Sequence, residues 1–271
     1  MRTLVFKAVI LFIISVCFFD LVIASNTVNI YNAESKQIGQ GLQLSSTMVV
    51  TSNKIVGKEG IIFKKDSIAY TKYTVIFNDP ISQLVFLQIN MPFKTITLKP
   101  ENKMIPMESV YAEIDGKLTD IGFFSAYVKG YGSYIGNYDN LYEAMPLYDK
   151  NGAVIGILFG RLADKLYLYL SVDWLYFYRD NMNTIVKAKK PVLNIVVHEL
   201  WDQPGILIGK SKNDNFKAGD VIVRVNNTMI RNVLDFHRAL IAYSAFDSMT
   251  VSVLRSGTLV AVDYSCRRDN K

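Results

Sequence analysis

The sequence predicts a mainly β protein built from two units. Half of its 271 residues are hydrophobic and a fifth are charged, which excludes a disordered chain and supports a buried core. Short runs of β-prone residues, bounded by turn-forming or polar residues, follow one another from Asn26 to about Tyr169. A basic stretch that ends at a proline, Lys187–Pro191, then separates these runs from a second set of strands. Short strands at such close spacing are typical of a β-barrel or β-sandwich.

Charge and composition exclude several classes of protein. The formal net charge is +6 without a long block of Lys or Arg, so a nucleic-acid binder is not expected. Two cysteines, Cys17 and Cys266, cannot supply a disulfide framework or a zinc site. The two histidines, His198 and His237, are too few for a His-rich metal centre. We therefore expect neither a metal nor a cofactor.

The N-terminus has the pattern of an export signal. Arg2 and Lys7 flank a short polar start, residues 8–19 are almost wholly apolar, and Val22–Ala24 offers small residues at a cleavage position. We expect residues 1–24 to be a signal peptide that is removed, and the mature protein to be exported, as to a periplasm. The alternative is an uncleaved N-terminal membrane anchor, although the apolar run is short for a bilayer.

The first unit, residues 26–182, is predicted from its strand-like runs and one helix. Val172 to about Met182 is predicted to be helical because Trp174, Leu175 and Tyr178 fall on one face. Residues 183–190 are expected to form a linker. The strand-like runs are TVNIY, LQLSS, MVVTS, YTVIF, LVFLQI, SVYAEI, AVIGILF and LYLYLSV.

The second unit, residues 191–266, is predicted to combine strands with one helix. A helix over Val233–Tyr243 would have Asn232 as its N-cap, with Asp235 three residues later as in a capping box. Ser256-Gly257 is suited to a two-residue hairpin turn. The strand-like runs are VLNIVV, GILIG, DVIVRV and MTVSVLRS, and the apolar stripe of the helix is Val233, Phe236, Ala239 and Leu240.

Eight segments follow one another in an order that matches a known family. They are Gly39–Leu42 (like GSGF), Val50–Val56 (like LTNNHVV), Asp79–Leu87 (like DPxxDLAVL), Leu141–Leu147 (in the place of GNSGGPL), Asn151–Ile157 (like NGEVIGI), Ser171–Trp174 (like PVNW), Asn215–Ile222 (like GLKPGDVI) and Val225–Asn227 (like VNG). Each match alone is weak, and their common order is what makes the case specific. The chain resembles the HtrA (Deg) family, in which an exported trypsin-like serine protease domain precedes a PDZ domain.

The resemblance implies a trypsin-like double β-barrel followed by a PDZ domain of the α+β type. It places Lys54 where the catalytic histidine would stand, Gln83 at the aspartate and Glu143 at the serine. A lysine with an ordinary pKa of about 10.4 is a poor base at neutral pH, and Glu143 carries no hydroxyl to attack a peptide. The chain is therefore expected to be a pseudoprotease with vestigial triad positions and not an enzyme.

The oxyanion hole is also expected to be lost. The glycines of the family motif are replaced by Leu141, Ala144 and Met145, and a turn that needs a positive φ is hard to hold without glycine. Three alternatives remain open for Lys54 and Glu143. They form an ion pair in the vestigial cleft, they are separate solvated charges, or they belong to a new active site.

The second unit is expected to bind peptide C-termini, as the resemblance to a PDZ domain implies. Such domains add an extended peptide to a sheet edge and hold its carboxylate in a loop. Asn194 stands for the loop glycine and tolerates the left-handed conformation better than most residues. The alternatives are that Leu193 and Ile195 belong to the core of a strand and that His237 lies on an exposed face of its helix. The expected peptide-binding residues are Val192, Leu193, Asn194, Ile195, His237 and Ile241.

The sequence thus favours an exported, non-catalytic HtrA-like protein that binds proteins or peptides. It would serve as an assembly factor, or as a subunit or regulator of an envelope complex. A partner in a membrane complex and the formation of homo-oligomers are both compatible with this role. The alternatives are a divergent active serine endopeptidase and a chaperone-like binder of unfolded protein.

Overall fold

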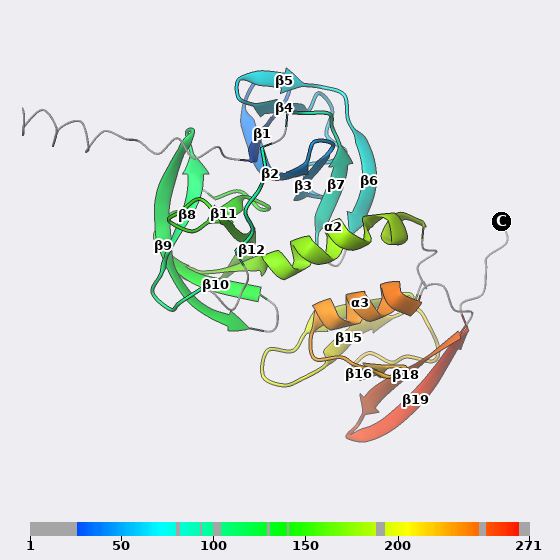
Figure 1. Ribbon diagram of the computed structural model, residues 1–271. Coiled ribbons are helices and arrows are strands. Elements are labelled where there is room, and N and C mark those ends of the chain that lie inside the picture. The colour runs from blue at the N-terminus through cyan, green and yellow to red at the C-terminus, as the bar shows by residue number, and fades with distance from the viewer. Residues whose placement is uncertain are drawn as a thin grey trace, which may run out of the picture.

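The computed structural model describes residues 26–79, 82–92, 94–99, 104–128, 131–139, 141–187, 193–243 and 248–265. The expected signal peptide at residues 1–24, both cysteines and Val192 lie outside these residues. The described chain is mainly β, as predicted, and Figure 1 shows two β structures side by side above a third.

The first structure is an antiparallel sheet with the strand order β5-β4-β1-β2-β3-β7-β6. The central strands β2, β3 and β7 are buried along most of their length, because apolar clusters cover both faces of the sheet. The short strands β4 and β5 lie in a stretch where no strand-like run was identified. The strands are β1 (Thr27–Tyr31), β2 (Gln37–Ser45), β3 (Met48–Ser52), β4 (Ile62–Lys65), β5 (Ile68–Tyr70), β6 (Thr74–Asp79) and β7 (Leu84–Gln88).

The second structure is a closed barrel in the order β10-β13-β12-β11-β8-β9. Gly132 permits this closure, because a Cβ there would lie 1.9 Å from a ring atom of Tyr169 on the neighbouring strand. The ring thus occupies the space that a side chain would need. The strands are β8 (Ser109–Ile114), β9 (Lys117–Val128), β10 (Tyr131–Gly136), β11 (Pro146–Tyr148), β12 (Val154–Ala163) and β13 (Leu166–Ser171).

Helix α2 (Val172–Lys187) follows β13 directly and crosses the molecule between the two β structures and the C-terminal unit (Figure 1). Trp174 and Tyr178 are fully buried, in agreement with the predicted apolar face. The helix continues five residues past the predicted end, into the stretch expected to be a linker. The buried Ile185 explains the extension, because it prolongs the apolar face by another turn.

The C-terminal unit is a sheet in the order β14-β15-β16-β18-β19, with β17 paired to β16 and α3 packed against it. Helix α3 has the predicted bounds, and Asn232 caps it by accepting the Asp235 amide at 2.8 Å. Ser256 and Gly257 both take positive φ, as the predicted two-residue hairpin requires. The elements are β14 (Ile195–Glu199), β15 (Ile206–Ser211), β16 (Val221–Val225), β17 (Thr228–Met229), α3 (Val233–Tyr243), β18 (Ser248–Arg255) and β19 (Thr258–Ser265).

One apolar core continues from the N-terminal sheet through α2 into the C-terminal unit. Phe86 of the sheet, Trp174 of α2 and Phe236 of α3 belong to the same cluster of buried side chains. Two separate clusters fill the barrel and the far side of the first sheet. The C-terminal unit therefore shares a core with the rest of the chain.

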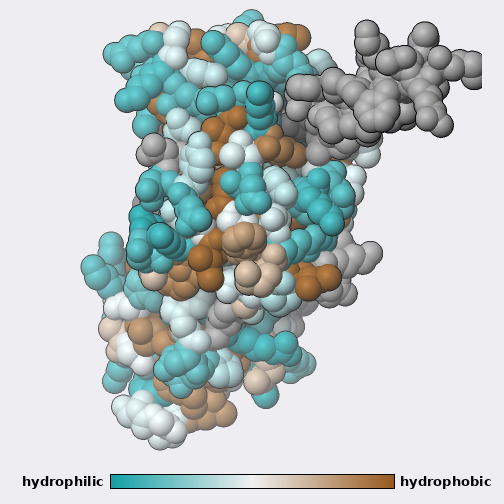
Figure 2. Space-filling model, turned by 90° about the vertical axis from the view of Figure 1, so that its left-hand side faces the viewer, coloured by the Kyte–Doolittle hydropathy of each residue, from teal (hydrophilic) through white to brown (hydrophobic). Residues whose placement is uncertain are grey.

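Apolar side chains are scattered over the surface. Figure 2 views the side of β8 and β9 and shows hydrophobic residues in small groups among hydrophilic ones. Phe123 of β9 and Ile135 of β10 are opposite each other in the strand register and both are exposed. Within the described residues, no helix has the length and apolar character needed to cross a bilayer.

Candidate functional site

Two of the three predicted triad positions meet in space. Lys54 follows β3, and Glu143 lies in the turn between β10 and β11, 89 residues later. The Lys54 ammonium nitrogen lies 2.7 Å from the Glu143 carboxylate, and the two side chains are 61% and 41% exposed. They therefore form an ion pair that is open to solvent.

Gln83 lies beside the same loop through its backbone. It sits in the turn that joins β6 to β7, with a φ of +56°, and its carbonyl accepts the amide of Asn53 at 2.9 Å. The residue before Lys54 is thus tied to Gln83, and the segments of all three predicted positions are neighbours.

Ser52 joins this group and was not singled out from the sequence. Its hydroxyl donates to the second Glu143 carboxylate oxygen at 3.4 Å and accepts the Lys54 amide at 3.3 Å. A hydroxyl group therefore stands beside the Glu143 carboxylate, although Glu143 itself carries none. The Glu143 carboxylate is engaged by the Lys54 ammonium, and Ser52 is buried, so the arrangement is poorly suited to attack on a peptide.

The turn that would carry an oxyanion hole holds a positive φ without glycine. Ala144 has a φ of +60°, which costs about 1–2 kcal/mol for a residue with a Cβ. Its amide donates to the Leu158 carbonyl at 2.8 Å, and the Met145 amide donates to Tyr142 at 3.2 Å. Leu141 is half-buried against the barrel core. These two amides are therefore used inside the protein.

The predicted peptide-binding strand lies at a sheet edge. Among the described strands β14 pairs with β15, and α3 lies beside it. Asn194 has a φ of +52° and is exposed, and its carbonyl accepts the Lys212 amide at 2.9 Å. Leu193 is buried and Ile195 is half-buried. Asn194 thus takes the left-handed conformation expected of the residue that replaces the loop glycine.

His237 was expected to face a bound peptide, and the structure places it elsewhere. Its ring is buried against α2, 6.2 Å between ring centroids from Trp174. The Nε2 atom lies 3.3 Å from a carboxylate oxygen of Asp79 and 3.3 Å from the Tyr178 hydroxyl. The physical reason is that α2 covers this face of α3. Ile241 belongs to α3 by its backbone, and its side chain is outside the described part.

A buried polar cluster therefore lies where the two units meet. It consists of Asp79 at the end of β6, Ser82 in the following turn, Tyr178 of α2 and His237 of α3. Burial, together with the negative charge of Asp79, raises the pKa of the Tyr178 hydroxyl well above its usual value. Although serine, histidine and aspartate are all present, every member is buried, so a substrate has no access.

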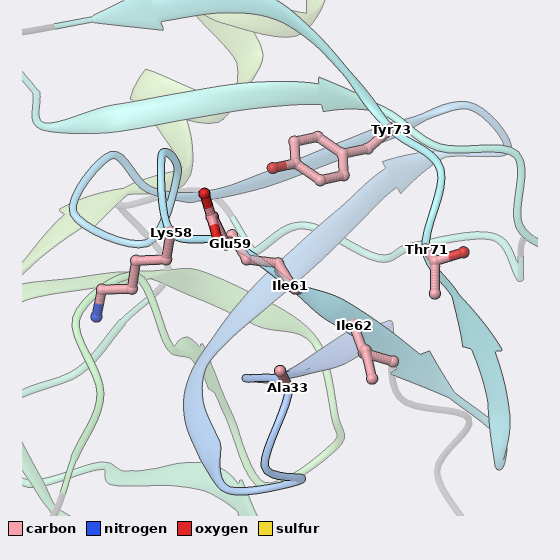
Figure 3. A pocket seen from close by; sticks show the side chains of 8 residues that line it. Ala33, Lys58, Glu59, Ile61, Ile62, Thr71 and Tyr73 are labelled. Carbon is pink, nitrogen blue, oxygen red and sulfur yellow. The ribbon is translucent and has the colours of Figure 1, made fainter.

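A surface pocket on the N-terminal sheet is lined in part by the loop that follows Lys54. In Figure 3 the Tyr73 hydroxyl and the Glu59 carboxylate point toward each other, whereas the Lys58 ammonium points away. Ile61 and Thr71 also line it. The lining combines one carboxylate and two hydroxyls with apolar side chains, and we assign it no reaction.

Comparisons with known proteins agree with the geometry of the fold. No family model and no curated protein matches the sequence. The chain is similar to a solved structure of a serine endoprotease from Yersinia pestis, with 17% identity, 89% of this chain and 93% of that chain covered, and a TM-score of 0.63. The HtrA-type protease AlgW solved with a tripeptide has 17% identity, coverage of 89% and 93%, and a TM-score of 0.60.

The chain has the fold of HtrA-type serine proteases. A further structure of AlgW, solved with a decapeptide, has 15% identity, coverage of 89% and 95%, and a TM-score of 0.62. Because these identities are low, the likeness establishes the fold alone. The mainly β, trypsin-like architecture predicted from the motif order is confirmed.

Proposed function

We propose that this protein is an exported, non-catalytic homologue of HtrA-type proteases that acts by binding proteins or peptides. The observation that carries the proposal is the Lys54–Glu143 ion pair, which fills the place where a base and a nucleophile would meet. Both histidines of the chain belong to the C-terminal unit, so neither supplies the missing base. A retained fold with altered chemistry favours recognition over turnover.

We further propose that the C-terminal unit is a PDZ domain whose β14 edge accepts an extended peptide. The position of β14 at the end of the sheet, among the strands that the structure describes, and the left-handed Asn194 support this proposal. A peptide would add a strand to β14, with its carboxylate near Leu193–Ile195. AlgW was solved with short peptides, which is in line with peptide binding by this fold. His237 has no part in this site, since its ring faces α2.

Peptide binding is tested by titrating the purified mature chain with a library of labelled peptides that end in a free carboxylate or an amide. Peptides with a free carboxylate should bind and their amides should not. Asn194→Gly should retain binding because glycine adopts a positive φ freely, whereas Asn194→Val should weaken it about tenfold, the equivalent of about 1–2 kcal/mol of strain. Equal binding by both variants would contradict the assigned loop.

The absence of catalysis is tested on the same preparation with a fluorophosphonate probe and casein. No labelling and no cleavage are expected. Labelling that maps to a serine would establish the rival function, a divergent serine endopeptidase. Binding of unfolded protein without regard to its terminus would instead favour a chaperone-like role.

Export is proposed from residues 1–24, and it is tested by N-terminal sequencing of the protein from its native host. Cleavage predicts a new terminus near Ser25 or Asn26. An intact Met1 in the membrane fraction would show an anchor.

A further inference from the structure

The carboxylate of Asp79 is the centre of the buried cluster. One of its oxygens accepts the Ser82 hydroxyl at 2.7 Å and the Tyr178 hydroxyl, and it lies 3.3 Å from Nε2 of His237. The Ser82 backbone amide approaches the same oxygen at 3.4 Å. A carboxylate surrounded by donors is stabilised in its ionised form. The carboxylate is thus surrounded by polar groups from three elements.

These elements belong to both units of the chain. Asp79 and Ser82 flank the turn between β6 and β7, and Tyr178 is on α2, so three of the four groups come from the N-terminal part. His237 on α3 is the member that the C-terminal unit contributes. The contact between Nε2 of His237 and the Asp79 carboxylate therefore joins the two units directly.

The surroundings of the cluster are apolar and aromatic. The His237 ring packs on Trp174 and Phe177 of α2, and the guanidinium of Arg238 lies over Phe177. At the other end of the junction, Trp201 packs against Tyr131 of the barrel. The Arg238 guanidinium also donates to the Asp173 carbonyl of α2 at 3.5 Å. The cluster thus lies in a junction that combines aromatic and apolar contacts with a few polar ones.

Burying a charge in such a junction brings little net stability. Desolvation opposes the attraction between the groups, and apolar replacements of similar size are often as stable. Directional hydrogen bonds differ from apolar contacts in that they fix one geometry. A buried polar group can therefore select one packing among several apolar ones.

We propose that the buried polar cluster fixes the orientation of the C-terminal unit on α2 and the β6–β7 turn. The cluster consists of Asp79, Ser82, Tyr178 and His237. Apolar contacts supply most of the junction, and the polar contacts of His237 with Asp79 and Tyr178 select the angle between the units. This inference concerns the junction and is independent of peptide binding at β14.

The test measures the distance between two spin labels by pulsed electron paramagnetic resonance. Lys58→Cys and Thr258→Cys place the labels on exposed positions of the two units, in a full chain that also carries Cys17→Ser and Cys266→Ser. The parent protein should give one narrow distance distribution.

His237→Phe is the decisive variant. Phenylalanine keeps an aromatic ring against Trp174 and Phe177 and removes the ring nitrogen that lies 3.3 Å from both the Asp79 carboxylate and the Tyr178 hydroxyl. It leaves the hydrogen bonds from Ser82 and Tyr178 to Asp79 in place. A broadened distribution or a second population is expected. Loss of one polar contact of ordinary strength shifts the ratio of fixed to altered orientation by about twofold to tenfold.

His198→Phe is the matched control, because His198 is exposed on β14 and the same change should leave the distribution narrow. Asp79→Asn provides a second variant of nearly unchanged shape, should His237→Phe fail to fold, and it should also broaden the distribution. Circular dichroism confirms that each variant is folded. Distributions as narrow as that of the parent in the folded variants would overturn the proposal, as would equal broadening by His198→Phe.

Discussion

The Lys54–Glu143 ion pair should contribute almost nothing to the stability of the fold. Glu143→Gln removes the charge and keeps the shape of the side chain. Although the two charged atoms are only 2.7 Å apart, both side chains are largely exposed, so solvent screens their attraction. Exposed pairs of this kind contribute about 0–1 kcal/mol. The free energy of unfolding should therefore change by less than about 1 kcal/mol.

Lys99 offers a matched contrast within the same chain. Its ammonium nitrogen lies 2.6 Å from Glu108 and 3.4 Å from Asp149, and all three side chains are largely buried. Lys99→Met would leave two neighbouring buried carboxylates without their cation. Such a loss costs about 3–5 kcal/mol. Urea unfolding followed by circular dichroism measures both variants under the same conditions.

A second prediction for the same residues concerns catalytic activity. Lys54→His, Gln83→Asp and Glu143→Ser combined should still fail to react with a fluorophosphonate probe. The reason is that Leu141, Ala144 and Met145 stand where the family motif has glycines, so the turn is not expected to form an oxyanion hole. A loss above about 2 kcal/mol for Glu143→Gln would show that the pair is structural. Labelling of the combined variant would refute the reasoning about the turn.

Two further predictions concern the C-terminal sheet and the barrel. Asp220 is buried and accepts two hydrogen bonds from Arg255, at 2.8 and 2.7 Å, so Asp220→Asn should cost about 1.5–3 kcal/mol in urea unfolding. These bonds hold the pKa of Asp220 below its usual value of about 3.9, so its stabilisation is present above about pH 4 and is lost as the pH falls through the folded pKa. Unfolding measured from pH 6 to pH 2 should therefore depend less on pH in Asp220→Asn, and an unchanged dependence would contradict this origin. In the barrel, Gly132→Ala should cost about 1–3 kcal/mol because the new methyl group would overlap Tyr169, whereas Gly160→Ala, with open space around it, should be nearly neutral by thermal unfolding. Equal costs would contradict the packing argument.

Strands with a strong apolar signal were predictable, and weaker strands were not. β1 (Thr27–Tyr31) has the bounds that its sequence run indicates. β10 (Tyr131–Gly136) was missed because Gly132 and Gly136 lower its strand propensity. The structure explains why glycine occupies position 132, since the Tyr169 ring fills the space that a side chain there would need. Local propensity yields to packing here, and packing partners are not visible in a single sequence.

The neighbourhood of Lys54 and Glu143 was expected from the order of motifs and not from any periodicity. Two residues 89 positions apart share no local pattern, so only the resemblance to a fold placed them together. Ser52 shows the limit of this approach. It ends β3 with no feature that distinguishes it from other strand-end serines, and its bond to Glu143 depends on side-chain geometry.

The sequence of helix α3 contains buried residues beyond its predicted apolar stripe, and these residues contact a second element, α2. Val233, Phe236 and Leu240 account for the face toward the sheet, as expected for an amphipathic helix with one covered side. Leu234 and His237 are also buried, and they fall outside that stripe. An apolar arc wider than one sheet can cover predicts a second partner, and here that partner is α2. A histidine at the edge of such an arc is then more consistent with a polar contact inside a junction than with a solvent-facing groove. The location of Asp79, 158 residues earlier in the chain, is the part that only the fold supplies.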